Sequence, residues 1–227
     1  MMNSDEQFRR QKERIRKRLL KYTRKAFRML PQMDKLRILD IGCGSGIPTL
    51  ELAGLGKGEV IGIDIDQPAL ERLTRAIEKR GLTDRVRAIS CSLFEMDFNS
   101  ESFDVVWSEG AIYAVGFERG LREWRRFLKP GGFMVVHDEQ GNVKEKLEQI
   151  LKSGYELLGH FLLGEEIWKI EYFAPLEKLI SQYLTRGDYP GVLVELRRAQ
   201  EELDIFKNNP ARCCSVYFVM KKPIRPH

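Results

Sequence analysis

Apolar residues along this chain follow two different periods. Short continuous apolar runs are typical of strands buried on both faces, whereas apolar residues at every third or fourth position predict helices. The predicted strands are 36–41, 59–65, 86–92, 103–107, 133–136, 155–163 and 213–220. The predicted helices between them are 48–55, 66–81, 117–128 and 143–151, and residues 129–132 read as a turn into the fifth strand. Strand–helix alternation of this kind favours a parallel sheet with right-handed crossovers and helices on both faces.

The regular alternation breaks after Leu163. Pro175 and Gly187 bracket one predicted helix, and a second runs from about 191 to 207 before the final strand. Two helices therefore interrupt what would otherwise be a hairpin at the edge of the sheet. The resulting division is a core over 35–163, a helical insertion over 164–208, and the last core strand with a tail over 209–227.

The N-terminal segment, residues 1–34, is strongly basic and amphipathic. Residues 5–30 predict one helix that Pro31 ends, with a narrow apolar stripe at helical spacing. Residues 8–30 hold eleven Lys or Arg and one acid, Glu13, a local balance of +10 within a total of +5. The other residues together therefore carry −5. We expect this helix and the insertion to close over the carboxyl edge of the sheet as a lid and substrate cap.

Length and composition narrow the class of protein. A chain of 227 residues with 43% hydrophobic content suits one α/β domain with additions. No apolar run approaches the roughly 20 residues of a membrane span, and the charged N-terminus is unlike a signal peptide, so we expect a cytoplasmic protein without a membrane partner. The four cysteines, Cys43, Cys91, Cys213 and Cys214, lack C-x-x-C spacing, which disfavours a zinc site and indicates reduced thiols.

The run from Arg37 to Gly46 carries the clearest functional signal. It reads as a buried strand that breaks into a turn with glycine at alternate positions, followed by a helix with Pro48 in its first turn. Such a turn lets the backbone approach a ligand, and the helix N-terminus favours an anionic group. The dinucleotide pattern G-x-G-x-x-G fails because Ile47 occupies its last position. Asp40 stands two residues before the first glycine instead.

A second acid supports a nucleoside ligand. Asp64 ends the second predicted strand, 22 residues after Gly42, where a carboxylate can accept hydrogen bonds from both ribose hydroxyls. The nearby Asp66 is more simply explained as the cap of the next helix. The alternative is a tight turn with a chance surface acid.

These residues resemble a known family over roughly 36–140. The segment 37–53 is similar to the first motif of class I S-adenosylmethionine-dependent methyltransferases, and 60–65, 103–110 and 128–132 resemble later motifs of that class. Residues 108–113 and 116–118 resemble the ubiquinone/menaquinone-biosynthesis (type 11) branch. The resemblance implies a Rossmann-like three-layer α/β/α fold with a mainly parallel seven-stranded sheet and an antiparallel last strand. It also implies S-adenosylmethionine as cofactor, S-adenosylhomocysteine as product and methyl transfer to a small-molecule acceptor.

The resemblance assigns cofactor-binding positions along the motifs. Ser92 departs from the pattern, because the family commonly has an acid at this adenine-contacting position, and a neutral serine makes a weaker contact. The implied cofactor-binding residues are Asp40, Gly42, Cys43, Gly44, Gly46, Asp64, Ile65, Ser92, Leu93, Ser108 and Glu109.

The methyltransferase class shares no single catalytic residue, since catalysis depends mainly on the alignment of cofactor and acceptor and on the exclusion of water. Glu109, after the fourth strand, is the first candidate for a base or substrate anchor, and orientation of the cofactor is the alternative role. His137 could act as a base or be a packed strand-end histidine. Tyr113, Trp168 and Tyr172 could line the substrate pocket or belong to the core.

The sequence leaves other functions open. The basic helix suggests an rRNA or tRNA methyltransferase, but the segment 108–111 lacks the Asn/Asp-Pro-Pro-aromatic run typical of base-amino methylation. The pair Glu109 and Glu118 suggests arginine methylation, yet no substrate-binding β domain follows.

Metal-assisted transfer would require Glu109, Asp138 and Asn142 to converge on one ion, and we predict no metal. A non-catalytic S-adenosylmethionine-binding module is the remaining alternative, and the sequence leaves the acceptor and the oligomeric state open.

Overall fold

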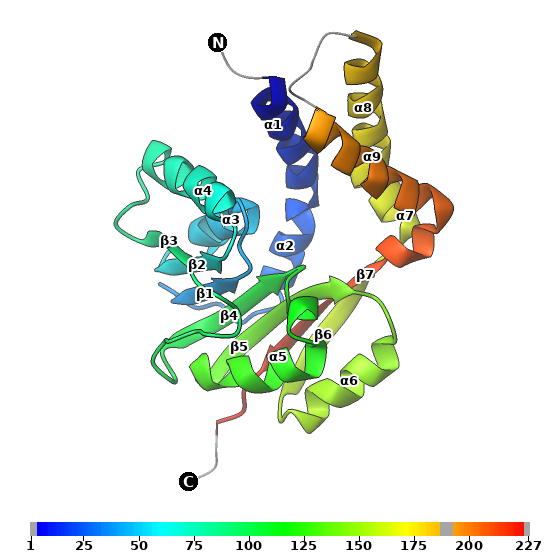
Figure 1. Ribbon diagram of the computed structural model, residues 1–227. Coiled ribbons are helices and arrows are strands. Elements are labelled where there is room, and N and C mark those ends of the chain that lie inside the picture. Colours follow the sequence, from blue (N-terminus) through cyan, green and yellow to red (C-terminus); the bar gives the residue numbers. More distant parts are fainter. Residues whose placement is uncertain (1–3, 187–192, 225–227) are drawn as a thin grey trace. The chain divides into compact units, whose positions relative to one another are not determined.

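A seven-stranded mixed sheet organises most of the chain (Figure 1). The computed structural model describes residues 4–186 and 193–224. Its strand order is β3-β2-β1-β4-β5-β7-β6. The strands are β1 (Ile38–Ile41), β2 (Val60–Asp64), β3 (Val86–Ser90), β4 (Phe103–Glu109), β5 (Leu128–Glu139), β6 (Glu156–Leu163) and β7 (Ser215–Lys221).

Strand directions agree with the predicted fold class. Strands β1 to β5 pair in parallel with their neighbours. At the β5–β7 step the backbone N–H of Gly131 donates to Lys222 O at 2.9 Å, and the Lys222 N–H donates to Gly132 O at 2.8 Å. These bonds join the beginning of β5 to the end of β7, which makes the last strand antiparallel. The prediction of a Rossmann-like sheet with an antiparallel last strand is confirmed.

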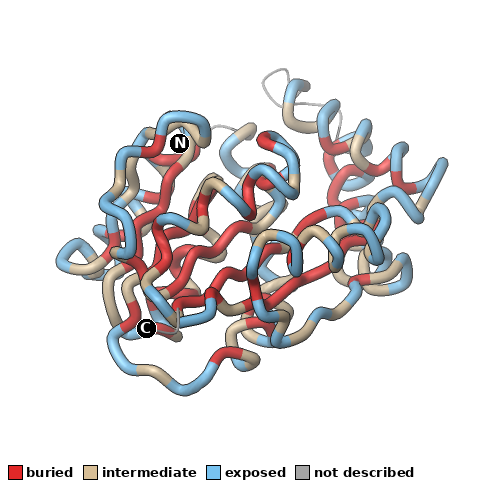
Figure 2. The backbone as a smooth tube through the Cα atoms, turned by 90° about the horizontal axis from the view of Figure 1, so that it is seen from below, coloured by how far each residue is buried: buried red, intermediate tan, exposed pale blue. Residues whose placement is uncertain are grey.

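Helices cover both faces of the sheet. In Figure 1, α3 and α4 lie on one face, and α5 and α6 lie on the other. Side chains alternate along each strand, so Leu39 and Ile41 of β1 join the cluster that includes Leu121 and Trp124 of α5, whereas Asp40 points to the opposite face. Figure 2 shows the buried residues running along the strands. The helices are α1 (Ser4–Arg16), α2 (Leu20–Phe27), α3 (Ile47–Gly56), α4 (Gln67–Lys79), α5 (Phe117–Trp124), α6 (Val143–Lys152), α7 (Glu165–Trp168), α8 (Ala174–Arg186) and α9 (Leu193–Asn208).

The chain divides into two compact units. Unit 1 combines Met1–Tyr22 with Leu162–Ser215, and unit 2 combines Thr23–Phe161 with Val216–His227. Unit 1 has its own core, in which Phe8 of α1 packs with aromatic and aliphatic residues of 172–206. The N-terminal helix and the insertion therefore share one core. Their role as a substrate cap stays a prediction.

The N-terminal helix differs from the single helix predicted over 5–30. A 3₁₀ turn, Lys17–Leu19, separates α1 from α2. Phe8 of α1 is buried in unit 1, whereas Thr23 and Ala26 of α2 are buried in unit 2. The tighter turn lies close to the residue at which the helix changes its packing partners.

The predicted turn at 129–132 lies within β5 rather than before it, as an irregularity in the pairing of β5 with β4. Gly131 has a φ of +76°, so it bends the strand, yet the pairing with Lys222 continues through it. A π-helical turn, Lys169–Phe173, joins α7 to α8 and was not predicted. The predicted limits at Gly187 and residue 191 lie outside the described residues.

Candidate functional site

The glycine turn lies at the carboxyl edge of the sheet between β1 and α3. The backbone N–H groups of Gly42 and Cys43 both donate to Ile63 O of β2, each at 2.9 Å. The Gly46 N–H donates to Cys43 O at 2.9 Å and closes the turn. Bonds to both β2 and the turn itself fix this backbone before any ligand arrives.

The three glycines of the turn have different surroundings. All have positive φ, with +74° at Gly42, +52° at Gly44 and +76° at Gly46. A Cβ at Gly42 would lie 2.2 Å from the Ala111 Cβ, and one at Gly46 would lie 2.2 Å from a Leu73 methyl carbon. A Cβ at Gly44 would meet nothing within 4 Å. Gly42 and Gly46 thus permit close packing, while Gly44 borders open space where a ligand can approach the backbone.

Asp64, at the end of β2, is held against this turn. Its Oδ2 accepts from the Gly44 N–H at 2.7 Å, and its Oδ1 accepts from the Asp66 N–H at 2.9 Å. Asp66 caps α4 by accepting from the Ala69 N–H at 3.0 Å, as predicted. The next residue, Ile65, exposes 72% of its surface. An anchored carboxylate, an open backbone turn and an exposed apolar side chain together fit a nucleoside ligand.

The segment after β3 carries the predicted adenine-contacting residues. Asp64 and Ser90 are register partners, so this segment leaves the sheet beside the end of β2. The Ser92 Oγ accepts from the Phe94 N–H at 3.2 Å and shapes a local turn. Leu93 packs against the large core cluster. The positions of both residues in the sequence agree with a nucleoside ligand. Their contacts with the adenine ring stay a prediction.

Among the predicted cofactor residues, Asp40 and Ser108 are polar and yet buried. Asp40 exposes 1% of its surface, and its Oδ2 accepts from the Thr49 Oγ1 of α3 at 2.6 Å. Ser108 is fully buried, and within the described residues its hydroxyl has no hydrogen-bond partner. An unsatisfied buried hydroxyl at the end of β4 is unusual, since buried polar groups are normally paired.

Glu109 is held by donors from three separate segments. Its Oε1 accepts from the Thr23 Oγ1 of α2 at 2.9 Å and from the Trp107 Nε1 of β4 at 2.8 Å. The Tyr217 hydroxyl of β7 also hydrogen-bonds with Glu109 and Thr23. Burial, followed by the Glu109 charge, raises the pKa of Tyr217, which keeps this phenol protonated as a donor.

His137 lies next to this cluster as the register partner of Glu109 on β5. Its ring stacks on Tyr217 with centroids 4.2 Å apart and an interplanar angle of 16°. Burial lowers the pKa of His137 to about 3, so the ring is neutral at pH 7. A group of such low basicity is a weak general base, which supports the alternative interpretation as a packed strand-end histidine.

The three predicted substrate-contacting aromatics lie in different units. Tyr113 belongs to unit 2 and exposes 68% of its surface. Trp168 and Tyr172 belong to unit 1, where their ring centroids are 5.9 Å apart, and Trp168 Nε1 donates to Ser215 Oγ at 3.1 Å. Tyr172 exposes only 3% of its surface, which supports the core interpretation. A substrate role for these residues stays a prediction.

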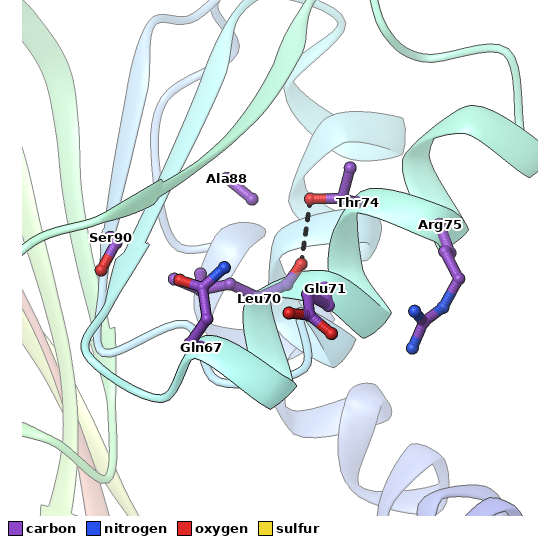
Figure 3. Close-up of a pocket in the computed structure, with 7 residues that line it drawn as sticks. All are labelled: Gln67, Leu70, Glu71, Thr74, Arg75, Ala88 and Ser90. Atoms are coloured by element: carbon purple, nitrogen blue, oxygen red, sulfur yellow. Dashed lines mark hydrogen bonds between the residues drawn. The ribbon is translucent and has the colours of Figure 1, made fainter.

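A separate groove follows α4 and the edge strand β3 (Figure 3). Its volume is about 460 Å³. Figure 3 shows polar side chains of α4 along one side and the small side chains of Ala88 and Ser90 along the other. None of the residues that line this groove is a predicted site residue. The lining residues are Gln67, Leu70, Glu71, Thr74, Arg75, Ala88 and Ser90.

The residues considered for metal-assisted transfer have other contacts. Asp138 Oδ2 accepts from Lys146 Nζ at 2.6 Å, and the Asn142 Oδ1 caps α6 by accepting from the Glu145 N–H at 3.2 Å. Within residues 4–186 and 193–224, no group of three or more His, Cys, Asp or Glu side chains could hold a metal ion. In that same part of the chain, no helix is both long and apolar enough to cross a membrane.

Many cations of the basic helix are paired with acids. Arg9 and Lys12 contact Glu195 and Glu202 of α9 at 3.5 Å and 2.7 Å. The other ion pairs of this segment are Arg9–Asp5, Arg10–Glu6, Arg18–Glu171, Lys21–Glu171 and Arg24–Glu51. These contacts neutralise much of the charge that suggested a nucleic-acid partner.

Comparison with known proteins places this arrangement in a family. Residues 38–132 match the family model described as a methyltransferase domain. A sterol 24-C-methyltransferase of Gibberella zeae is 27% identical over 185 residues, which cover 69% of this chain and 49% of that protein. The chain therefore spans about half the length of this curated relative.

Solved structures share the fold. The [4+2]-cyclase SpnF matches with a TM-score of 0.73 and 20% identity, covering 90% of this chain and 81% of that one. A methyltransferase from Thiobacillus denitrificans, bound to S-adenosylhomocysteine, matches with a TM-score of 0.69 and 20% identity, covering 89% and 90%. The glycine turn, Asp64 and the matched family model lead to one conclusion: residues 38–132 of this chain belong to the class I S-adenosylmethionine-dependent methyltransferase family.

Proposed function

We propose that this protein transfers the methyl group of S-adenosylmethionine to a small-molecule acceptor. The observation that carries the proposal is the contact between the Asp64 carboxylate and the Gly44 N–H, beside open space at Gly44. This contact joins the glycine turn to the acid at the end of β2, and a nucleoside cofactor requires both features at the carboxyl edge of the sheet. The named activity of the Gibberella relative supports the reaction class.

In this proposal the cofactor supplies an electrophilic methyl group, and the protein orients it. Asp64 would accept hydrogen bonds from the ribose hydroxyls, and the exposed Ile65 would cover one face of the adenine. The turn residues Gly42, Cys43, Gly44 and Gly46 would hold the methionine end, and Ser92 and Leu93 would contact the base. Asp40, Ser108 and Glu109 complete the proposed set.

We assign Glu109 as the anchor of the acceptor, or as its base where a proton must leave. Donors from α2, β4 and β7 fix the carboxylate at the end of β4, so its position does not depend on the ligand. His137 would contribute through its stacking on Tyr217 rather than through proton transfer. A substrate contact stays a proposal for Tyr113 in unit 2 and for Trp168 in unit 1, whereas the burial of Tyr172 supports its place in the core of unit 1.

The test is a product assay with the intact chain and a panel of acceptors. Sterols with a side-chain double bond, quinone precursors, small amines and phenols would each be incubated with S-adenosylmethionine, and S-adenosylhomocysteine would be quantified by mass spectrometry. We expect acceptor-dependent product that the Asp64→Ala variant forms at a rate at least tenfold lower. Cofactor binding without product for any acceptor would instead favour a non-catalytic module.

We also propose that the protein acts in the cytoplasm. The basis is the presence of four free cysteines, two of them buried, which is typical of a reducing compartment. Cell fractionation with an antibody to the chain tests this assignment, and recovery in an oxidising compartment would contradict it.

A further inference from the structure

One hydrogen bond joins the two arms of the glycine turn. Asp40 precedes the turn on β1, and Thr49 follows it in the first turn of α3. The Thr49 Oγ1 donates to the Asp40 Oδ2 at 2.6 Å, and the two residues expose 0% and 1% of their surfaces. The bond therefore fixes the Asp40 carboxyl group inside the protein, beside the backbone that we assign to the cofactor.

Among residues 4–186 and 193–224, no lysine or arginine side chain pairs with Asp40. Its charged neighbours, Asp64 and Glu109, are acidic as well. A buried carboxylate in such surroundings costs stability, so the structure carries a group that the fold alone does not require.

The proposed cofactor is itself a cation. S-Adenosylmethionine carries a sulfonium charge that S-adenosylhomocysteine lacks, and the two molecules otherwise differ by one methyl group. A carboxylate fixed in the protein interior attracts a nearby cation more strongly than an exposed carboxylate does, because water screens the exposed charge. We propose that the Asp40 carboxylate, held in place by Thr49, favours the cationic S-adenosylmethionine over S-adenosylhomocysteine and so promotes exchange of product for cofactor. Asp40 and Thr49 are positioning residues in this scheme.

The preference depends on pH, because burial first, and then Glu109 and Asp64, raise the pKa of Asp40 to about 7, against the Thr49 hydrogen bond. The groups that face Asp40 are Thr49 of α3, Asp64 of β2, Glu109 of β4 and Cys43 of the turn. Burial raises the pKa of the Cys43 thiol far enough that it stays neutral. Asp40 is thus ionised at pH 8.5 and mostly protonated at pH 6.

The proposal rests on the cofactor assignment but not on any acceptor, so calorimetry with the whole chain tests it directly. The probes are S-adenosylmethionine and S-adenosylhomocysteine, each titrated at pH 6 and at pH 8.5. At pH 8.5, Asp40→Asn is expected to weaken S-adenosylmethionine binding by about 5- to 10-fold and S-adenosylhomocysteine binding by less than about twofold. At pH 6 the variant and the wild type should bind each probe within about twofold of one another.

A second pair of variants tests the role of Thr49. Thr49→Val removes the donor that favours the ionised carboxyl group, so the pH at which S-adenosylmethionine affinity rises should move up by about one unit. Thr49→Ser keeps the hydroxyl and should restore the wild-type profile. Thr74→Val on α4 and Asp97→Asn, at an exposed position, are matched controls that should change neither profile.

Two results would overturn the proposal. One is an equal loss of affinity for both probes in Asp40→Asn, which would indicate a role in the shape of the turn only. The other is a wild-type ratio of the two affinities that is the same at pH 6 and pH 8.5, which decides the matter even where a variant does not fold. Failure of the wild type to bind either probe would instead contradict the cofactor assignment.

Discussion

The carboxylate of Glu109 shows how single residues determine this site. Thr23, Trp107 and Tyr217 direct hydrogen bonds at it from α2, β4 and β7. Each donor lies on an element whose position the fold determines independently. A carboxylate held in this way is pre-organised, and its loss should affect transfer more than binding.

Replacing Glu109 with glutamine is expected to lower turnover at least tenfold while leaving the affinity for S-adenosylhomocysteine within twofold. The amide keeps the size of the side chain and loses the charge and the basicity. Turnover would be measured with an acceptor found in the panel, and the affinity by calorimetry. Glu118→Gln, at an exposed position on α5, is the matched control. Full activity in Glu109→Gln would remove this residue as base or anchor.

Thr23 should matter through its hydroxyl group. Thr23→Val keeps the shape of a residue that exposes 1% of its surface but leaves Glu109 with one donor fewer. We expect turnover to fall about 3- to 10-fold, and Thr23→Ser to retain most of it, since a hydrogen bond to a charged group contributes roughly 1.5–3 kcal/mol. Equal losses in both variants would point to packing instead.

At this scale, the sequence predicts residues within motifs and misses those that reach the site from elsewhere. Asp40, Asp64 and the glycines could be found because strand, turn and helix follow one another along the chain. Thr23 and Tyr217 contact the same carboxylate although they are 194 positions apart in the numbering. No local pattern marks either residue, because their contacts arise only when the fold brings α2 near the end of β4 and places β7 in the sheet beside β5.

At the level of elements, hydrophobic periodicity located the strands because most of their buried positions are apolar. It failed where backbone pairing overrode side-chain signals. Pro130 and Gly131 look like a turn, yet Lys222 of the distant C-terminal segment pairs with Gly131 and Gly132 and extends β5. The interruption of the N-terminal helix was equally invisible, since its apolar stripe continues while its packing partner changes.

The basic helix is expected to bind nucleic acid weakly or not at all, because acids of unit 1 neutralise several of its cations. A shift assay with single-stranded and duplex RNA at low salt should show no complex, since counterion release from unpaired cations drives such binding. Salt-dependent binding that Arg14→Gln, Arg16→Gln and Lys17→Gln together abolish would contradict this. These three exposed residues form no ion pair among the described residues, so they are the positions to substitute.

At the scale of the whole molecule, we expect two buried groups to make the free energy of unfolding depend on pH in opposite directions. Asp40 has a pKa raised from 3.8 to about 7, so the folded state holds the proton of this carboxyl group more tightly than the unfolded state does. The destabilisation of the folded state by Asp40 therefore grows as the pH rises from about 4 to about 7. His137 has a pKa lowered from 6.5 to about 3, so the stability of its neutral form is present above pH 6.5 and is lost as pH falls toward 3.

Asp40→Asn should therefore raise the free energy of unfolding at pH 8 by about 1–3 kcal/mol, with little difference near pH 4. Urea denaturation followed by tryptophan fluorescence at the two pH values measures this. An equal shift at both values would mean that Asp40 is not desolvated as the structure indicates.

The division into two units has a practical consequence for anyone who manipulates the gene. The polypeptide passes from one unit to the other at 22/23, 161/162 and 215/216. No single uninterrupted stretch of codons encodes either unit, so deleting the first 22 residues would remove part of a core rather than a tail. Fragments for expression, permuted termini or domain exchanges with relatives must respect all three passages at once.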